Sequence, residues 1–230
     1  METISASLEA VRARIRAAEA QFGRPPGSVG LLAVGKTRPA GDIRAAFAAG
    51  QRDFGESYVN EALAKMAALA DLSLVWHFIG PIQSNKTRAI AERFAWVHSV
   101  DRLKVASRLS AQRPPGLAPL QVCIEVNVSG EASKAGVAPE GLVSLALEVA
   151  GLPGLRLRGL MTVPAPEASF ERQRTPFGRL RRHFDDLRAR GLPLDTLSMG
   201  MTADVEAAIA EGATIVRIGT AIFGPRQRRE

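Results

Sequence analysis

The chain has 230 residues, of which 46% are hydrophobic and 23% charged, and its formal net charge is +7. This composition is ordinary for a globular domain, and no apolar run approaches the roughly 20 residues that a membrane-spanning helix needs. The single cysteine, Cys123, excludes an internal disulfide and a cysteine-based metal cluster. The amphipathic N-terminal stretch lacks an apolar signal-peptide core, so we predict a cytoplasmic protein without a membrane partner.

The positive charge is scattered along the chain. Arginines account for 25 of the 30 basic residues, and many lie in helical patterns such as 177–190, where carboxylates are interspersed. Aromatic residues make up only 5% of the chain and mostly lie in apolar patterns, away from basic residues. We therefore predict no nucleic-acid partner. An anionic small molecule needs only a local positive site and fits the charge as well.

Short apolar runs alternate with helical patterns after the N-terminal helix. The predicted strands are 30–34, 51–54, 74–79, 95–99, 120–126, 155–161, 195–198 and 213–218. The predicted helices between them are 39–49, 56–70, 84–93, 101–111, 139–150, 170–190 and 202–211. This alternation is typical of parallel strands joined by crossover helices. Eight strands favour an α/β fold with a single (β/α)₈ TIM barrel over residues 1–230, with an open doubly wound sheet as the alternative.

Functional side chains of such a barrel gather where its strands end. Lys36, one of five lysines, ends the first predicted strand. Partial desolvation there would favour a free amine, which a Schiff base with an aldehyde requires. The alternative is a lysine that only pairs with a carboxylate at the rim, such as Glu56.

Two stretches near the C-terminus read as anion sites. The sequence SMGMTADVEAAIA, residues 198–210, places small and hydroxyl residues, including Thr202, before a predicted helix. The sequence RIGTAIFG, residues 217–224, offers Gly219 and the hydroxyl of Thr220. Loops after the seventh and eighth strands commonly cradle phosphate in this barrel. An aldehyde carrying a phosphate is thus indicated, either pyridoxal 5′-phosphate or a phosphorylated sugar.

Arg217 bears on the choice between these aldehydes. If its side chain points inward, the guanidinium could face the ring nitrogen of pyridoxal phosphate and keep that nitrogen unprotonated. The ring would then be a weaker electron sink than one paired with a carboxylate. The alternative is a structural arginine paired with an acid such as Glu125.

Motifs spread over nearly the whole chain resemble the pyridoxal phosphate homeostasis protein family, small relatives of the alanine racemase barrel. They are AVGKTRP (33–39), FGESYVNE (54–61), WHFIGPIQSNKTR (76–88), SVDRLKVASRL (99–109), RGLMTVPAP (158–166), LSMGMTADVEAAIAEG (197–212) and VRIGTAIFG (216–224). The resemblance implies a barrel of the alanine racemase N-terminal domain type, a Schiff base on Lys36 and Arg217 near the ring nitrogen. It implies phosphate contacts from Ser198, Met201, Thr202, Gly219 and Thr220.

The chain departs from the family pattern at two implied contacts. Ser57 stands where the family commonly has asparagine, which leaves a shorter cofactor contact. Thr202 replaces the usual second serine and keeps the hydroxyl.

We predict no catalytic turnover, because the sequence offers no clear second base. Racemisation needs two bases, and the only tyrosine is Tyr58, while His77 and His98 lie in apolar strands. The resemblance implies a protein that binds pyridoxal 5′-phosphate and takes part in vitamin B6 homeostasis. We predict that it stores and delivers the cofactor, with apo-enzymes as recipients, and that the isolated barrel is a monomer. Lys134 is a candidate second amine for release, or else a solvated loop lysine. A racemase-like amino-acid enzyme and a class I aldolase-like barrel are the alternatives.

Overall fold

The computed structural model describes residues 3–130 and 135–225. Within them, eight parallel strands close into a barrel whose strand order follows the chain, and β1 pairs with β8 to complete it. The strands are β1 (Gly30–Val34), β2 (Asp53–Glu56), β3 (Val75–Phe78), β4 (Trp96–Val100), β5 (Leu120–Glu125), β6 (Leu155–Met161), β7 (Thr196–Ser198) and β8 (Ile215–Ile218). This confirms the predicted (β/α)₈ barrel and excludes the open sheet.

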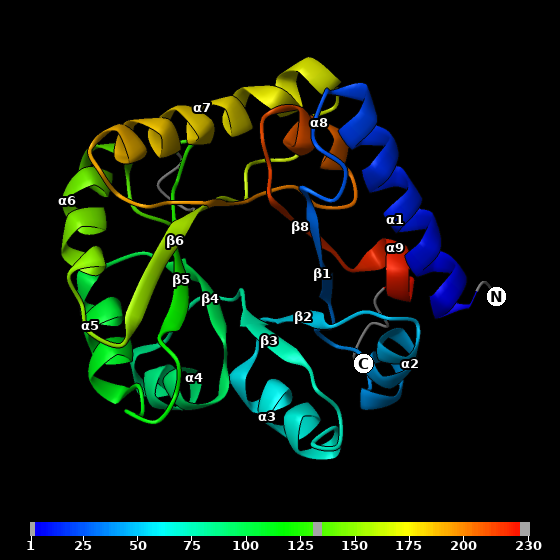
Figure 1. Ribbon diagram of the computed structural model, residues 1–230, viewed down its shortest axis with the longest axis horizontal. Helices are drawn as coiled ribbons and strands as arrows, with labels where there is room; N and C mark the ends of the chain where they lie inside the picture. The colour runs from blue at the N-terminus through cyan, green and yellow to red at the C-terminus, as the bar shows by residue number, and fades with distance from the viewer. Residues whose placement is uncertain (1–2, 131–134, 226–230) are drawn as a thin grey trace.

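Helices surround the strands as an outer ring (Figure 1). They are α1 (Ile4–Gln21), α2 (Ala40–Ala48), α3 (Val59–Ala68), α4 (Thr87–Arg93), α5 (Leu103–Gln112), α6 (Pro139–Ala150), α7 (Phe170–Ala189), α8 (Val205–Ala210) and α9 (Thr220–Phe223), with a 3₁₀ turn at Ser84–Lys86. The N-terminal helix α1 packs against α8, α9 and α2, so the beginning and the end of the described chain meet on one side of the barrel (Figure 1). In the described residues, no helix is both long and apolar enough to cross a membrane.

Helix α1 illustrates how the outer helices pack against the barrel through a buried apolar face. Leu8, Val11, Ile15 and Ala18 recur at helical spacing and are all buried. Thr3 caps the helix by accepting a hydrogen bond from the backbone N–H of Ala6, which satisfies one otherwise unpaired donor. The apolar stripe and the cap therefore place this helix against the core that α8 and α9 share.

Among the strands, the predicted boundaries differ from the structure most at β2. The strand runs over Asp53–Glu56, two residues later than the predicted 51–54. Pairing decides this, since Phe54 and Gly55 align with Ala33 and Val34 of β1, and Asp53 aligns with Val75 of β3. The shift places Glu56 inside the barrel wall.

Cys123 lies on β5 and is fully buried. Burial raises the pKa of its thiol to about 12, so the reactive thiolate is scarce at neutral pH. We expect a thiol reagent to leave the native protein unmodified and to label one thiol after unfolding in guanidinium, as counted by mass spectrometry. Rapid labelling of the native protein would contradict this burial.

Candidate functional site

A cavity of about 310 Å³ opens at the carboxyl ends of the strands. Its wall comes from segments that follow six strands, as expected for a functional site in this barrel. The lining residues are Val34, Lys36, Arg38, Ser57, Ile79, Val163, Met201, Thr202, Ala203, Arg217, Gly219, Thr220 and Gly224. The cavity thus joins one lysine, two arginines and several hydroxyl groups to an apolar surface.

The turn after β1 directs the half-buried Lys36 to this cavity. Glycine at position 35 leaves room for two buried side chains, because a Cβ atom would lie 2.6 Å from Ile43 Cδ1 and 2.9 Å from Glu56 Oε1 and would force them to shift. The next residue, Thr37, has a φ of 65°, in the left-handed region that β-branched residues rarely adopt. The backbone N–H of Thr37 donates to the carboxylate of Glu61, which helps to hold this conformation. Neighbouring side chains therefore determine the position of the lysine-bearing turn.

A buried ion pair supports the same turn from below. Lys65 of α3 donates to Glu56 Oε1 at 2.7 Å, to Glu61 Oε1 at 2.7 Å and to the carbonyl of Gly35 at 2.6 Å. Burial raises the pKa of Glu56 to about 7, although Lys65 acts to lower it. Glu56 is therefore the hydrogen-bonded partner of Lys65, and Lys36 influences it through the charge on its amine.

The two predicted anion stretches lie side by side in the cavity wall. Met201 and Thr202 belong to the turn between β7 and α8, and Gly219 and Thr220 begin α9 after β8. The first N–H groups of a helix have no partner within it, so the start of α9 adds donors to the hydroxyls of the two threonines. The N–H of Met201 is already engaged, since it donates to Asp204 Oδ1 at 2.6 Å.

Gly219 serves the packing of this wall. A Cβ atom there would lie 3.1 Å from the carbonyl oxygen of Val34 and 3.3 Å from its Cβ. Glycine thus allows the turn after β8 to pack closely on the end of β1, which brings Thr220 and Lys36 into the same cavity.

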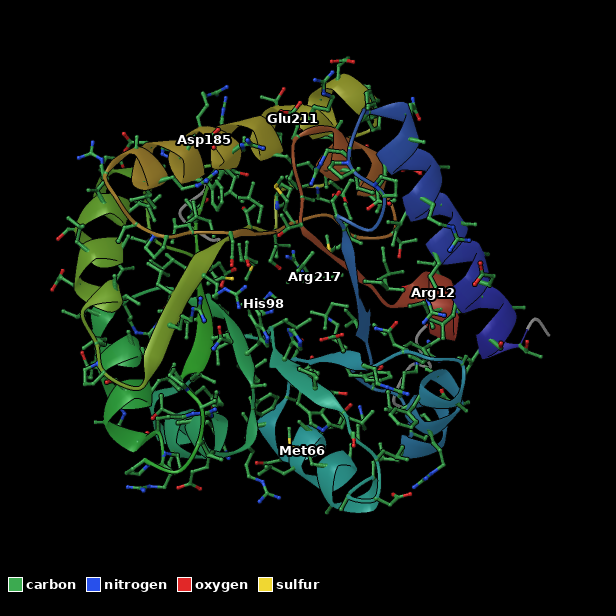
Figure 2. All side chains as sticks on the ribbon, in the orientation of Figure 1. Arg12, Met66, His98, Asp185, Glu211 and Arg217 are labelled. Atoms are coloured by element: carbon green, nitrogen blue, oxygen red, sulfur yellow. The ribbon has the colours of Figure 1, made fainter. Side chains whose placement is uncertain are left out.

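Arg217 reaches the cavity from inside the barrel, where Figure 2 shows it near His98. It is buried, and its guanidinium donates to the carbonyl oxygens of Ser198 and Thr162 at 2.6 and 2.9 Å. Burial lowers its pKa to about 10, and Glu125 acts through its charge to raise it. The side chain therefore stays cationic at neutral pH. The hydrogen bonds of this guanidinium go to Ser198 and Thr162, whereas Glu125, its partner in the alternative interpretation, acts on it through charge.

Seven of the eight predicted site residues line the cavity: Lys36, Ser57, Met201, Thr202, Arg217, Gly219 and Thr220. Ser198 lies apart from the wall and is fully buried on β7. Its hydroxyl lies 2.7 Å from His98 Nδ1 and 2.8 Å from Arg217 Nη1. The hydroxyl of Ser198 is therefore engaged with neighbours inside the barrel, and its phosphate contact stays a prediction.

Arg38 was missed as a lining residue. Its guanidinium donates to the carbonyl oxygens of Gly224 and Pro225, which ties the turn after β1 to the end of α9. A signal existed, since a basic residue two positions after Lys36 shares its turn. The apolar lining residues Ile79 and Val163 carry no comparable signal. Lys134, the candidate second amine, lies outside the described residues.

In the part of the chain described by the structure, no group of three or more histidine, cysteine or acidic side chains is arranged to hold a metal ion. The cavity instead combines an amine, an anion-binding edge and a buried guanidinium. This combination suits an aldehyde that carries a phosphate and an aromatic ring nitrogen.

Comparison with known proteins identifies the type of barrel. A family model described as the alanine racemase N-terminal domain matches residues 6–227. The alanine racemase of Corynebacterium glutamicum superposes with a TM-score of 0.68 at 18% identity, over 96% of this chain and 62% of that one. The family model and the closed barrel thus define a barrel of the alanine racemase N-terminal type.

Within that class, the chain belongs to the pyridoxal phosphate homeostasis protein family. It is 64% identical to the member from Pseudomonas aeruginosa, over 98% of this chain and 97% of the relative. It is 51% identical to the member from Escherichia coli, over 98% of both chains. PipY of Synechococcus elongatus, solved with pyridoxal phosphate bound, superposes with a TM-score of 0.80 at 39% identity, over 91% of this chain and all of that one. These matches confirm the family predicted from the motifs.

Proposed function

We propose that this chain binds pyridoxal 5′-phosphate as a Schiff base on Lys36 and stores and delivers it in vitamin B6 homeostasis, without catalytic turnover. The observation that carries the proposal is one cavity shared by Lys36, Arg217, Thr202 and Thr220. The PLP-bound relative PipY supports the choice of this cofactor over a phosphorylated sugar.

The donor set fits the cofactor group by group. The amine of Lys36 is the nucleophile that a Schiff base with the aldehyde requires. The hydroxyls of Thr202 and Thr220, with the first N–H groups of α9, are suited to the phosphate. The guanidinium of Arg217 has donors and no acceptor, so it suits an unprotonated ring nitrogen. Ser57 and the apolar side chain of Ile79 complete the surroundings of the ring.

The absence of turnover is supported by the groups that could act as a second base. Tyr58 is 57% exposed and is not among the residues that line the cavity. The buried rings of His77 and His98 have both nitrogens within hydrogen-bond distance of neighbours inside the barrel. The racemase-like alternative would need one of these side chains as its second base, and none of the three lines the cavity.

Delivery completes the proposed function, with apo-enzymes as recipients and a cytoplasmic monomer as the working form. The buried, unpaired Cys123 agrees with a reducing compartment. The cavity opens at the loop face of the barrel, where a bound cofactor would be accessible to a recipient.

The first test is the absorption spectrum of the purified protein, followed by borohydride reduction and mass mapping. We expect a yellow protein in which the phosphopyridoxyl group is fixed on Lys36. A colourless protein that remains unlabelled after addition of pyridoxal 5′-phosphate would overturn the proposal. Exchange of the α-hydrogen of an amino acid in heavy water would instead support the racemase-like alternative.

A further inference from the structure

A chain of hydrogen bonds crosses the barrel interior beneath Arg217. Arg217 Nη1 lies 2.8 Å from Ser198 Oγ, which lies 2.7 Å from His98 Nδ1. His98 Nε2 lies 2.9 Å from His77 Nδ1, and His77 Nε2 lies 3.1 Å from Asp53 Oδ1. Four strands, β8, β7, β4 and β3, thus link the cavity arginine to the first residue of β2.

The two ends of this chain lie in different surroundings. Arg217 lines the cofactor cavity at the carboxyl ends of the strands. Asp53 lines a separate cavity of about 180 Å³ at the amino ends, together with His77 and Trp96. Its side chain is 47% exposed, whereas those of the residues between it and Arg217 are buried. The connection therefore runs from solvent at one end of the barrel to the ligand cavity at the other.

The chemistry of the end groups determines the direction of the first and last hydrogen bonds. A guanidinium only donates, so Ser198 Oγ accepts from Arg217. A carboxylate only accepts, so His77 Nε2 must carry the proton that points to Asp53.

Burial disfavours the charged form of both histidines between these ends. Burial lowers the pKa of His77 against the opposing effect of Asp53. Burial lowers the pKa of His98 well below its usual value, and His77 and Arg217 lower it further. A neutral imidazole has one donor and one acceptor, so His98 donates from Nε2 to His77 and accepts at Nδ1 from the hydroxyl of Ser198. Both rings are therefore held as the Nε2–H tautomer.

We propose that Asp53, His77, His98 and Ser198 act as positioning residues that hold the guanidinium of Arg217 toward the ligand's ring nitrogen. The hydrogen bonds with Ser198 and Thr162 use three of the five N–H groups of Arg217, which leaves two donors on a side chain that lines the cavity. This inference rests on the proposed function, because the ring nitrogen belongs to the proposed cofactor.

The stacking of the rings supports a fixed geometry. His77 is stacked on Trp96, with ring centroids 5.4 Å apart and an interplanar angle of 6°. Aligned hydrogen bonds in a low-dielectric interior also polarise one another. A substitution at Asp53 should therefore change the hydrogen bonding of Arg217, although Asp53 contacts only His77, at the far end of the hydrogen-bond series.

The test compares the Asp53→Asn and Asp71→Asn variants. Asp71 is the matched control, since it is a half-exposed carboxylate whose ion pair with Arg44 lies at the surface. An asparagine can offer His77 either an acceptor or a donor, so the direction of the chain is no longer enforced. We expect Asp53→Asn to weaken binding of pyridoxal 5′-phosphate by about three- to tenfold, the worth of one hydrogen bond, and to alter the absorption band of the bound cofactor. Asp71→Asn should change neither.

Nitrogen-15 NMR of the three histidines, recorded without cofactor, gives an independent readout. In the wild-type protein we expect Nε2–H tautomers for both His77 and His98. In Asp53→Asn the signals of both should shift, while His183 on α7 remains as the reference. A response confined to His77 would overturn the inference. If borohydride leaves Lys36 unlabelled in the wild-type protein, the proposed function fails. The NMR result still decides whether the hydrogen bonds from Asp53 to Ser198 form one connected series.

A double-mutant cycle separates positioning from a general structural effect. Ser198→Ala removes the link between His98 and Arg217, and we expect it to weaken cofactor binding by about tenfold. In that background, Asp53→Asn should change the affinity by less than about twofold, because coupled residues are not additive. Independent, multiplicative losses would overturn the inference. Should Ser198→Ala fail to fold, the NMR comparison of Asp53→Asn decides alone.

Discussion

The Lys36→Met variant is expected to bind pyridoxal 5′-phosphate at least about a hundredfold more weakly than the wild-type protein, a difference of about 3 kcal/mol. Methionine keeps a similar length and removes the amine, so the proposed covalent bond is lost while the hydroxyls of Thr202 and Thr220, the proposed phosphate contacts, remain in the cavity wall. The absorption band of the Schiff base should disappear, and borohydride should fix no phosphopyridoxyl group at this position. Equilibrium dialysis together with the spectrum checks both expectations.

Lys104→Met is the matched control, since Lys104 is an exposed lysine on α5. It should keep the affinity and the spectrum of the wild-type protein. Retention of the yellow Schiff-base band in Lys36→Met would show that another amine holds the cofactor. Lys65 would then be the first position to map, because its amine lies 2.6 Å from the carbonyl oxygen of Gly35, just before Lys36.

The Lys65→Met variant is expected to be markedly less stable than the wild-type protein. The loss in the free energy of unfolding should grow with pH. Lys65 compensates the carboxylate of Glu56, which is fully buried. Removing one partner of a buried ion pair destabilises a protein by about 3 kcal/mol or more. We expect a loss of about 3 kcal/mol at pH 8 and a loss nearer to about 1 kcal/mol at pH 5, where mainly hydrogen bonds are removed.

The sign of this pH dependence follows from the raised pKa of Glu56. Its folded-state pKa of about 7 exceeds the usual value of 4.5, so the folded protein retains a proton that the unfolded chain releases. The associated stability is fully present below pH 4.5 and is lost as the pH rises through 7. Without Lys65 the pKa rises further, so the loss of stability continues to higher pH.

Urea denaturation at the two pH values measures this effect, with Lys104→Met as the control at an exposed site. The double variant Glu56→Gln, Lys65→Met should recover stability at pH 8, because it removes the uncompensated carboxyl together with its partner. Equal losses at pH 5 and pH 8 for Lys65→Met would mean that Lys65 acts through packing alone.

Much of the fold and the composition of the site follow from local sequence patterns. Eight apolar runs separated by amphipathic helices have few solutions other than a barrel of parallel strands. Because parallel strands point their carboxyl ends in one direction, Lys36 and Thr220 could be placed at the same opening although 184 positions separate them in the numbering. The same reasoning correctly assembled most of the cavity wall.

The role of Ser198 could not be read from its motif. Its neighbours in sequence, Met201 and Thr202, line the cavity, yet Ser198 ends β7 with its hydroxyl inside the barrel. Local sequence describes a hydroxyl group before a helix, whereas strand register and pleat decide which face of the wall that hydroxyl occupies. Strand register likewise places β2 two positions later than predicted, which buries Glu56 beside Lys65.

The sequence by itself determined the class of barrel and placed Lys36, Thr202 and Thr220 at its opening, because each placement depends on residue types within a short segment. Only the tertiary structure decided that Asp53, His77, His98 and Ser198 form one connection to Arg217. These residues come from five strands, and barrel closure determines which of their side chains meet. The direction of the hydrogen bonds then follows from the donor at one end and the acceptor at the other.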